Sequence, residues 1–312
     1  MSTHHAVRRA RRPGRAPRRR RSPGLGRLGP LPWIGPAVLL ILLVVVWPVY
    51  EMVRTSLLRI SSSGFVRGTA GLDKYRRLTD EPALTSVLLA TVVWTLSVVA
   101  LTMVLSLALA QLFNQRFPGR RVTRWALIAP WAASVVMTAI GFKWMLDRTA
   151  GVLNTAMTDL GLIDGPKDWL GAPSTAWPWM IVVAVFVSLP FTTYTLLAGL
   201  QTIPDEVYEA ATVDGAGTWR TYWHITLPLL RPALLVGLVI NLINVFNSFP
   251  IIWSMTRGGP DSATATTTVF TFQLKNTDIG ESAAMSVVNF ALVLVMVAVF
   301  LKATRWNDEE SR

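Results

Sequence analysis

The sequence predicts an all-α integral membrane protein with about six transmembrane helices and both termini in the cytoplasm. The chain is 52% hydrophobic, only 15% of its 312 residues are charged, and the charges cluster between long uncharged stretches. A soluble domain usually carries about a quarter charged residues. Because a backbone that crosses lipid must satisfy its own hydrogen bonds, we expect each crossing to be a helix.

Six uncharged stretches are nearly as long as, or longer than, the length needed to cross roughly 30 Å of hydrocarbon. The first, residues 28–50, is longer than the apolar part of a signal peptide, and no small-residue cleavage site follows it. Pro130 and Pro190 predict kinks inside two of the helices. We expect a membrane domain at residues 31–306, with spans near 31–53, 86–112, 124–146, 177–200, 232–254 and 282–303.

Two tails flank this domain in the prediction, at residues 1–30 and 307–312. The first holds ten of the 30 basic residues of the chain, whose net charge is +12. It has too little apolar surface to fold alone, so we expect a disordered basic tail. Nucleic-acid binding is one reading, but an apolar run follows at once, which favours a cytoplasmic tail held near anionic lipid.

The distribution of lysine and arginine predicts the orientation. The arginine-rich tail and the short basic loop between residues 115 and 124 lie on the same side if there are six spans. Since basic residues are retained on the cytoplasmic side, both termini are expected there.

Composition also limits the chemistry of the chain. It has no cysteine, which excludes disulfides, thiolate metal sites and cysteine nucleophiles. Its histidines are His4, His5 and His224, all outside the expected spans, and no pair of carboxylates lies inside one. A membrane-embedded enzyme or a metal site is therefore disfavoured. A secondary transporter of a small polar solute stays an alternative, although such proteins usually need ionisable groups within the membrane.

The cytoplasmic loop at residues 201–231 is acidic in its first half, with Asp205, Glu206, Glu209 and Asp214. Anionic lipid would repel this charge, so we expect a protein partner. Thr202 is the expected helix cap, and Pro204 suits the first turn.

Val207, Ala210 and Ala211 are spaced to line one face of this short helix. Gly215 and Gly217 allow a sharp turn after it. A second short helix is expected at residues 218–225, running into the proline-containing start of the next span.

The spacing in this loop resembles the EAA loop of binding-protein-dependent ABC importer permeases. Glu-Ala-Ala at 209–211 is followed by Asp-Gly-Ala at 214–216 and by Ile-x-Leu-Pro at 225–228. Residues 71–75 resemble the external segment that precedes the second span in this family. Residues 200–204 and 256–260 resemble the carbohydrate branch, specifically the larger maltose-type permease subunit without its large external insertion.

The resemblance implies a type I ABC importer permease fold in the cytoplasmic (inner) membrane of a bacterium. It also implies a second homologous permease subunit, two cytoplasmic ATPase subunits and an extracytoplasmic solute-binding protein. The chain has no Gly-x-x-x-x-Gly-Lys-Ser/Thr phosphate loop, so it should bind no cofactor, with ATP and magnesium held by the ATPase. The residues expected to couple to that ATPase are Glu209, Ala210, Ala211, Asp214, Gly215, Ala216, Ile225, Leu227 and Pro228.

A polar stripe in the fifth expected span is the candidate substrate pathway. Asn241, Asn244 and Ser248 fall on one face of a helix, and amide and hydroxyl groups suit sugar hydroxyls. By resemblance, Ser188 and Phe191 of the fourth span line the same pathway. The expected function is import of a sugar or similar polyol, and Asn289 of the sixth span is interpreted as a packing or hinge residue.

Overall fold

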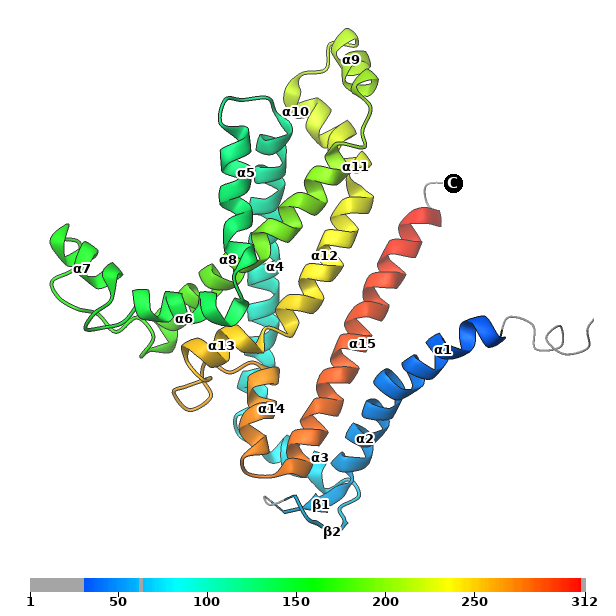
Figure 1. Ribbon diagram of the computed structural model, residues 1–312, viewed down its shortest axis with the longest axis vertical. Helices are drawn as coiled ribbons and strands as arrows, with labels where there is room; N and C mark the ends of the chain where they lie inside the picture. Colours follow the sequence, from blue (N-terminus) through cyan, green and yellow to red (C-terminus); the bar gives the residue numbers. More distant parts are fainter. Residues whose placement is uncertain (1–30, 62–63, 310–312) are drawn as a thin grey trace, which may run out of the picture. The chain divides into compact units, whose positions relative to one another are not determined.

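The computed structural model describes residues 31–61 and 64–309 (Figure 1). The basic tail expected at residues 1–30 lies outside the described residues, as do residues 310–312 of the expected C-terminal tail. The chain divides after Tyr50 into two compact units. Helix dominates the described residues of both, as the all-α prediction requires.

The described part of the first unit, residues 31–50, is helical. It comprises α1 (Leu31–Ile41), a π-helical turn (Leu42–Val46) and the start of α2 (Trp47–Ser56). The segment Trp33–Ser56 is long and apolar enough to cross a membrane.

Three further helices in the described chain meet the same test. They are α4 (Leu84–Asn114), α8 (Pro173–Leu200) and the Ile279–Lys302 part of α15 (Ile279–Glu309). A bent pair of helical segments, Thr218–Leu229 and Arg231–Phe246, meets at 65° and makes a fifth span if it is counted as one. Six spans therefore remains a prediction. Residues 307–309 continue α15 and do not form a separate tail.

The core of the second unit lies between α4, α8 and α12 (Arg231–Phe246), which pack against one another. Trp94 of α4 and Met180 of α8 are fully buried there, together with Ile252. Burying large apolar side chains at close packing density fixes how these helices meet. This rigid centre positions the polar residues described below.

The third expected span, residues 124–146, is not one helix. α5 (Arg120–Ile128) leads through a 3-10 turn (Ala129–Ala132) into α6 (Val135–Met145), and Figure 1 shows α6 running in a different direction. Pro130 lies in this turn and has no backbone N–H to donate to the preceding helical turn. The other expected proline kink causes no break in the helix, because α8 stays helical through Pro190.

The fifth expected span, residues 232–254, is also divided. α12 ends at Phe246, and α13 (Phe249–Met255) begins after Asn247 and Ser248. Pro250 lies in the first turn of α13, where a missing N–H is tolerated. Within a membrane, irregular backbone is tolerated where it is buried in protein or lines a cavity, so this break marks a place to look for one.

The segments between the long helices contain the only strands among the described residues. β1 (Leu58–Ile60) and β2 (Val66–Thr69) form an antiparallel hairpin, a small departure from the all-α prediction. The short helices α3 (Asp73–Asp80) and α7 (Val152–Asp159) lie in segments of the same kind. α14 (Thr267–Lys275) packs against α15, after the loop that follows α13.

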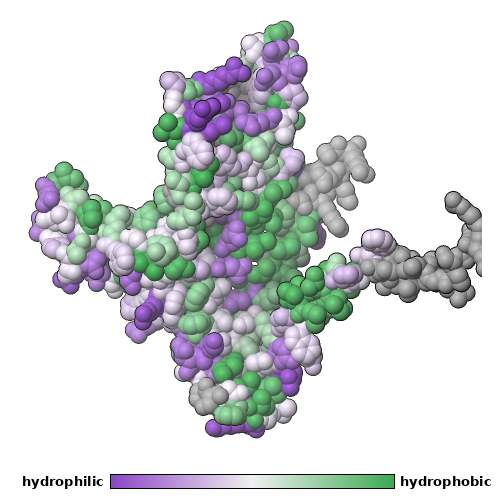
Figure 2. Space-filling view, viewed as in Figure 1, coloured by the Kyte–Doolittle hydropathy of each residue, from purple (hydrophilic) through white to green (hydrophobic). Residues whose placement is uncertain are grey.

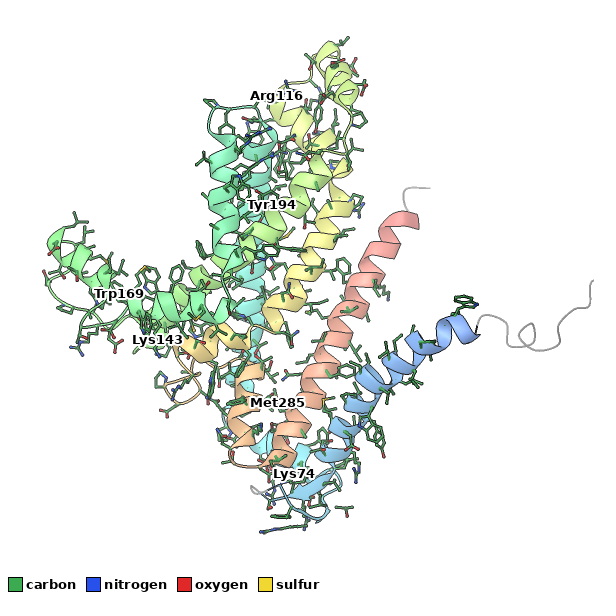
Figure 3. All side chains as sticks on the ribbon, in the orientation of Figure 1. Lys74, Arg116, Lys143, Trp169, Tyr194 and Met285 are labelled. Carbon is green, nitrogen blue, oxygen red and sulfur yellow. The ribbon has the colours of Figure 1, made fainter. Side chains whose placement is uncertain are left out.

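An ion-pair cluster joins α3 to the beginning of α15. Lys74 is 4% exposed, and its Nζ donates to Asp278 Oδ2 and lies 3.7 Å from Glu281 Oε1. Burial raises the pKa of Asp278, but hydrogen bonds from Lys74 and from the Glu281 backbone outweigh it, so this pKa is lowered. Figure 3 shows Lys74 at the opposite end of this unit from Arg116, which lies near α9 (Asp205–Val213).

Candidate functional site

The helix α9 begins differently from the sequence prediction. Its cap position is Pro204, in extended conformation, and no side chain caps the helix. Thr202 instead donates its hydroxyl to the Gly199 carbonyl at 2.7 Å. Its side chain is therefore bonded to the end of α8 and does not cap α9. Asp205 and Glu206 lie in the first turn, where negative charge interacts favourably with the helix dipole.

The end of α9 is a Schellman motif. Gly215 has φ +74°, and its N–H donates to Thr212 O at 3.1 Å, while the Ala216 N–H donates to Ala211 O at 2.9 Å. Glycine adopts this left-handed conformation without the clash that a Cβ would create. Gly217 has φ −69° and begins α10 (Thr218–Thr221), so the turn needs only one positive φ. Asp214 is exposed at the end of the helix.

One face of α9 packs on the molecule and the other is free. Ala211 is buried, Val207 and Tyr208 are half-buried, and all three lie on the packed face. Ala210, expected on this face, is exposed beside Glu209. Residue 211 lies four positions after 207 and three after 208, which places all three on one face of the helix. The exposed face is thus acidic and carries a small side chain at its centre.

The packed face of α9 rests on the ends of three long helices. Val207 and Tyr208 pack against a cluster that includes Phe113 of α4, Leu200 of α8 and Leu230 before α12. A Cβ at Gly199 would clash with the Cβ of Ala233, so α8 and α12 touch directly beneath α9. A force applied to α9 would therefore reach all three helices through packed atoms.

The second half of the loop is helical from Thr218 to Leu229 and includes a π-helical turn (Tyr222–Thr226) and α11 (Leu227–Leu229). Ile225 and Leu227 are half-buried there and Pro228 is exposed. Thr226 Oγ1 donates to the Tyr208 hydroxyl at 3.4 Å, which connects the two halves of the loop.

A hollow of about 400 Å³ lies where α8 meets the break between α12 and α13. The five residues expected in the substrate pathway all line it, although they come from α8, from α12 and from the break after α12. They are Ser188, Phe191, Asn241, Asn244 and Ser248. Figure 2 shows hydrophilic surface in the middle of the molecule, with hydrophobic surface around it.

Two of these residues show how the hollow is built. Asn241 is 2% exposed, and neither atom of its amide has a hydrogen-bond partner in the described part of the chain. Ser248 is held by Trp94, whose indole N–H lies 2.8 Å from Ser248 Oγ and 3.1 Å from the Val245 carbonyl. An unpartnered buried amide costs stability, and a polar ligand in the hollow could supply the missing hydrogen bonds.

Several residues of this region were not predicted from the sequence. Trp131, Thr192 and Asn247 also line the hollow, and Trp94 supports it from α4. Asn247 lies in the same expected span as the polar stripe and could have been included. Trp94 is 154 residues from Ser248, so no local pattern could have indicated it.

The chemistry of the hollow is that of a neutral polar site. Its polar lining consists of amides, hydroxyls and an indole, and no aspartate, glutamate, lysine or arginine is among the lining residues. No group of three or more metal-binding side chains occurs among the residues that the structure describes. Amides and hydroxyls both donate and accept hydrogen bonds, and beside exposed aromatic rings they suit a hydroxyl-rich ligand.

The model of one protein family matches residues 84–308 of the chain, and its description is "Binding-protein-dependent transport system inner membrane component". Among curated proteins, a probable ABC transporter permease protein of Brucella suis is 37% identical over 276 residues, 88% of this chain and 96% of that protein. The trehalose/maltose transport system permease protein MalF of Thermococcus litoralis is 34% identical over 286 residues, 91% and 95% of the two chains.

Among solved structures, a bacterial alginate ABC transporter, in complex with an alginate pentasaccharide-bound periplasmic protein, contains a similar chain. The TM-score is 0.74 at 20% identity, and the match covers 86% of this chain and 91% of that one. At this level of identity, the likeness shows that the two chains share a fold.

Proposed function

Because the chain belongs to the family of binding-protein-dependent transport system inner membrane components, we propose that it carries a sugar or similar polyol through the membrane as one permease subunit. A separate ATPase drives it through α9. The observation that carries the proposal is the free acidic face of α9, mounted on the ends of α4, α8 and α12. Family membership removes the alternative of a secondary transporter.

The substrate class follows from the hollow beside the α12–α13 break. Its amides and hydroxyls donate and accept hydrogen bonds, as sugar hydroxyls require, and Phe191 and Trp131 offer aromatic faces. The MalF relative of Thermococcus litoralis serves a trehalose/maltose transport system, which agrees with this class.

Glu209 is the residue proposed to contact the ATPase through a basic partner. It is exposed beside Ala210, whose small side chain allows another surface to approach closely. Gly215 sets the turn, Asp214 and Ala216 flank it, and Ile225, Leu227 and Pro228 shape the return segment. Closure of the ATPase would push α9 and so move the three helices beneath it.

The proposed assembly has a second homologous permease, two ATPase subunits and an extracytoplasmic solute-binding protein. The alginate transporter structure contains a periplasmic protein bound to a pentasaccharide, which supports the last of these partners. ATP and magnesium would bind to the ATPase. The loop at 258–260 and the segments that contain α3 and α7 are the proposed contacts of the solute-binding protein.

Sugar uptake by the variant Glu209→Lys tests the coupling role. Reversing a charge at a close ion pair in an interface costs several kcal/mol, so uptake should fall by at least about tenfold while the complex still inserts. The matched control is Glu209→Asp, which keeps the negative charge at the same position of α9 and should retain most of the uptake. Normal uptake by Glu209→Lys would contradict the proposal.

A further inference from the structure

We infer that the chain has a second carbohydrate subsite, between the α12–α13 break, α14 and α15, which binds a further sugar unit of the same substrate. This inference rests on the proposed function. The evidence is a second hollow of about 400 Å³ whose polar lining comes from three separate segments. It is lined by Asn247, Thr268, Thr271, Ser286, Asn289, Phe290 and Val293.

The two hollows are neighbours that share a residue. Asn247, at the break between α12 and α13, lines both of them. It is exposed, and its amide N–H donates to the Ile243 carbonyl at 2.9 Å, which fixes its orientation. A ligand longer than one sugar ring could therefore contact both hollows across this single side chain.

Asn289 shows that the second hollow is more than a packing defect. Its amide nitrogen donates to Thr271 Oγ1 at 2.9 Å, whereas its buried Oδ1 has no partner in the described part of the chain. A packing residue would satisfy both ends of its amide, because an orphaned acceptor costs stability. Asn289 was interpreted from the sequence as a packing or hinge residue, and its position in the lining adds a binding role.

Aromatic rings lie on the other side of this subsite. A third hollow of about 230 Å³ shares Thr268 and Thr271 with the second and is also lined by Phe249 and Phe272. Phe249 stacks on Trp253 at 5.5 Å between ring centroids, and Phe272 meets Trp253 edge-on at 4.6 Å. Hydroxyl and amide groups beside a rigid aromatic cluster form a suitable site for a sugar ring, which has polar edges and apolar faces.

The three hollows form a series from the end of the unit that carries Lys74 towards its middle. Lys275 and Ser282 line the third hollow, close in sequence to the ion pair of Asp278 with Lys74. Figure 1 shows α14 beside the first part of α15, at the end opposite α9. We therefore assign the second subsite to the part of the pathway farther from the cytoplasm. A substrate that enters from outside would reach it before the first hollow, which Asn244 lines.

The absence of cysteine from the sequence makes a labelling test direct. Single cysteines replace Asn244 in the first hollow, Thr268 in the second and the exposed Thr277 outside both. The assembled importer in vesicles is labelled with a small maleimide in the presence of glucose-series and N-acetylglucosamine-series sugars of one to four units. At a concentration of about ten times Kd, occupancy should slow labelling about tenfold.

The expected result has three parts. The effective series slows labelling of Asn244→Cys at every length, slows labelling of Thr268→Cys only from two or more units, and leaves Thr277→Cys unaffected. In uptake, Thr268→Val should raise KM for the longer sugars about tenfold relative to the single sugar, from loss of one hydrogen bond. The matched Thr277→Val should not change either KM.

Three results would overturn the inference. Protection at Asn244→Cys with no protection of Thr268→Cys at any length would remove the second subsite and leave the proposed function intact. Thr268→Cys that reacts in the isolated chain but not in the assembled importer without sugar would make this hollow a contact between subunits. No protection of Asn244→Cys by either series would contradict the proposed function as well.

Discussion

The α9 loop and the break between α12 and α13 acquire their shapes in different ways. At the end of α9, the bonds that form the turn join residues no more than five positions apart, such as Ala216 to Ala211. At the break, Trp94 reaches Ser248 from 154 positions away. The first structure is local and depends on one glycine, whereas the second exists only when the whole helical core has assembled.

This difference has a functional counterpart. A surface that docks on another protein has to keep its form while the membrane helices move, and local bonds allow that. A substrate hollow has to change between open and closed states, and contacts between separate helices provide the means. Four substitutions would break or sharpen the comparison.

The largest expected loss of stability comes from breaking the ion pair between Lys74 and Asp278. Like the bond from Trp94 to Ser248, this contact joins residues far apart in the sequence. Asp278→Asn leaves a buried lysine without its main partner and should lower the free energy of unfolding by about 3 kcal/mol. Thermal unfolding of the detergent-solubilised complex measures this. The exposed Asp80→Asn serves as the control, and equal melting temperatures for both variants would contradict the account.

The same ion pair predicts a dependence on pH. Because the folded pKa of Asp278 is lowered, its contribution is complete at neutral pH and is lost as the pH falls through that pKa, below about 4. Asp278→Asn should therefore melt with a weaker acid dependence than the unchanged chain. Parallel acid profiles would show that this carboxylate is not the group that titrates.

The second-largest effect, a decrease of about 2 kcal/mol in the free energy of unfolding, is expected for Trp94→Phe. The change removes the indole N–H from Ser248 and Val245 and leaves unfilled volume in a fully buried position. Both the melting temperature and KM for sugar should change, because Ser248 loses its support. Trp144→Phe, at an exposed position, is the control, and a change in stability without a change in KM would separate Trp94 from the site.

A smaller effect, about 1 kcal/mol, is expected for Gly215→Ala, since a Cβ is strained at φ +74°. Its consequence should be local, with faster amide hydrogen exchange in α9 and an unchanged melting temperature for the helical core. Gly215→Asn should resemble the unchanged chain because asparagine tolerates this conformation. A drop in the global melting temperature for Gly215→Ala would refute the local character of the loop.

The smallest effect on stability, with the opposite sign, is expected for Asn241→Leu. Replacing a buried amide without partners by an apolar side chain should leave stability unchanged or raise it by less than about 1 kcal/mol. Uptake should nevertheless fall about tenfold, which corresponds to one lost hydrogen bond to the sugar. If Asn241→Leu lost both stability and uptake, Asn241 would be a structural residue and would not be a sugar contact.

The sequence predicts structure that is formed by near neighbours better than structure that depends on contacts between distant residues. Gly215 and the acidic residues of α9 are visible because their geometry is set by near neighbours. The faces of α9 were predicted less well, since Ala210 is exposed and Tyr208 takes its place against α4 and α8. Thr202 was assigned as a cap because it precedes Pro204, but the end of α8 uses its hydroxyl first.

For the membrane helices, composition predicts how long each apolar segment is, but it does not predict whether the segment forms one unbroken helix. The turn at Pro130 and the break after Phe246 divide two expected spans, and each depends on the packing of several helices. The polar stripe Asn241, Asn244 and Ser248 was readable from helical spacing. Its supporting residue Trp94 and the second hollow at Thr268 and Asn289 required the three-dimensional structure.

The most direct measurement of the central claim uses a single cysteine at Ala210, on the exposed face of α9 in a chain that otherwise has none. A short bifunctional crosslinker on this cysteine, in the assembled importer, should join the chain to the ATPase subunit, and ATP binding should change the yield. A cysteine at Val152, exposed in α7, should give no such product. Absence of an ATPase crosslink from Ala210→Cys, or its modification from outside intact cells, would contradict the account.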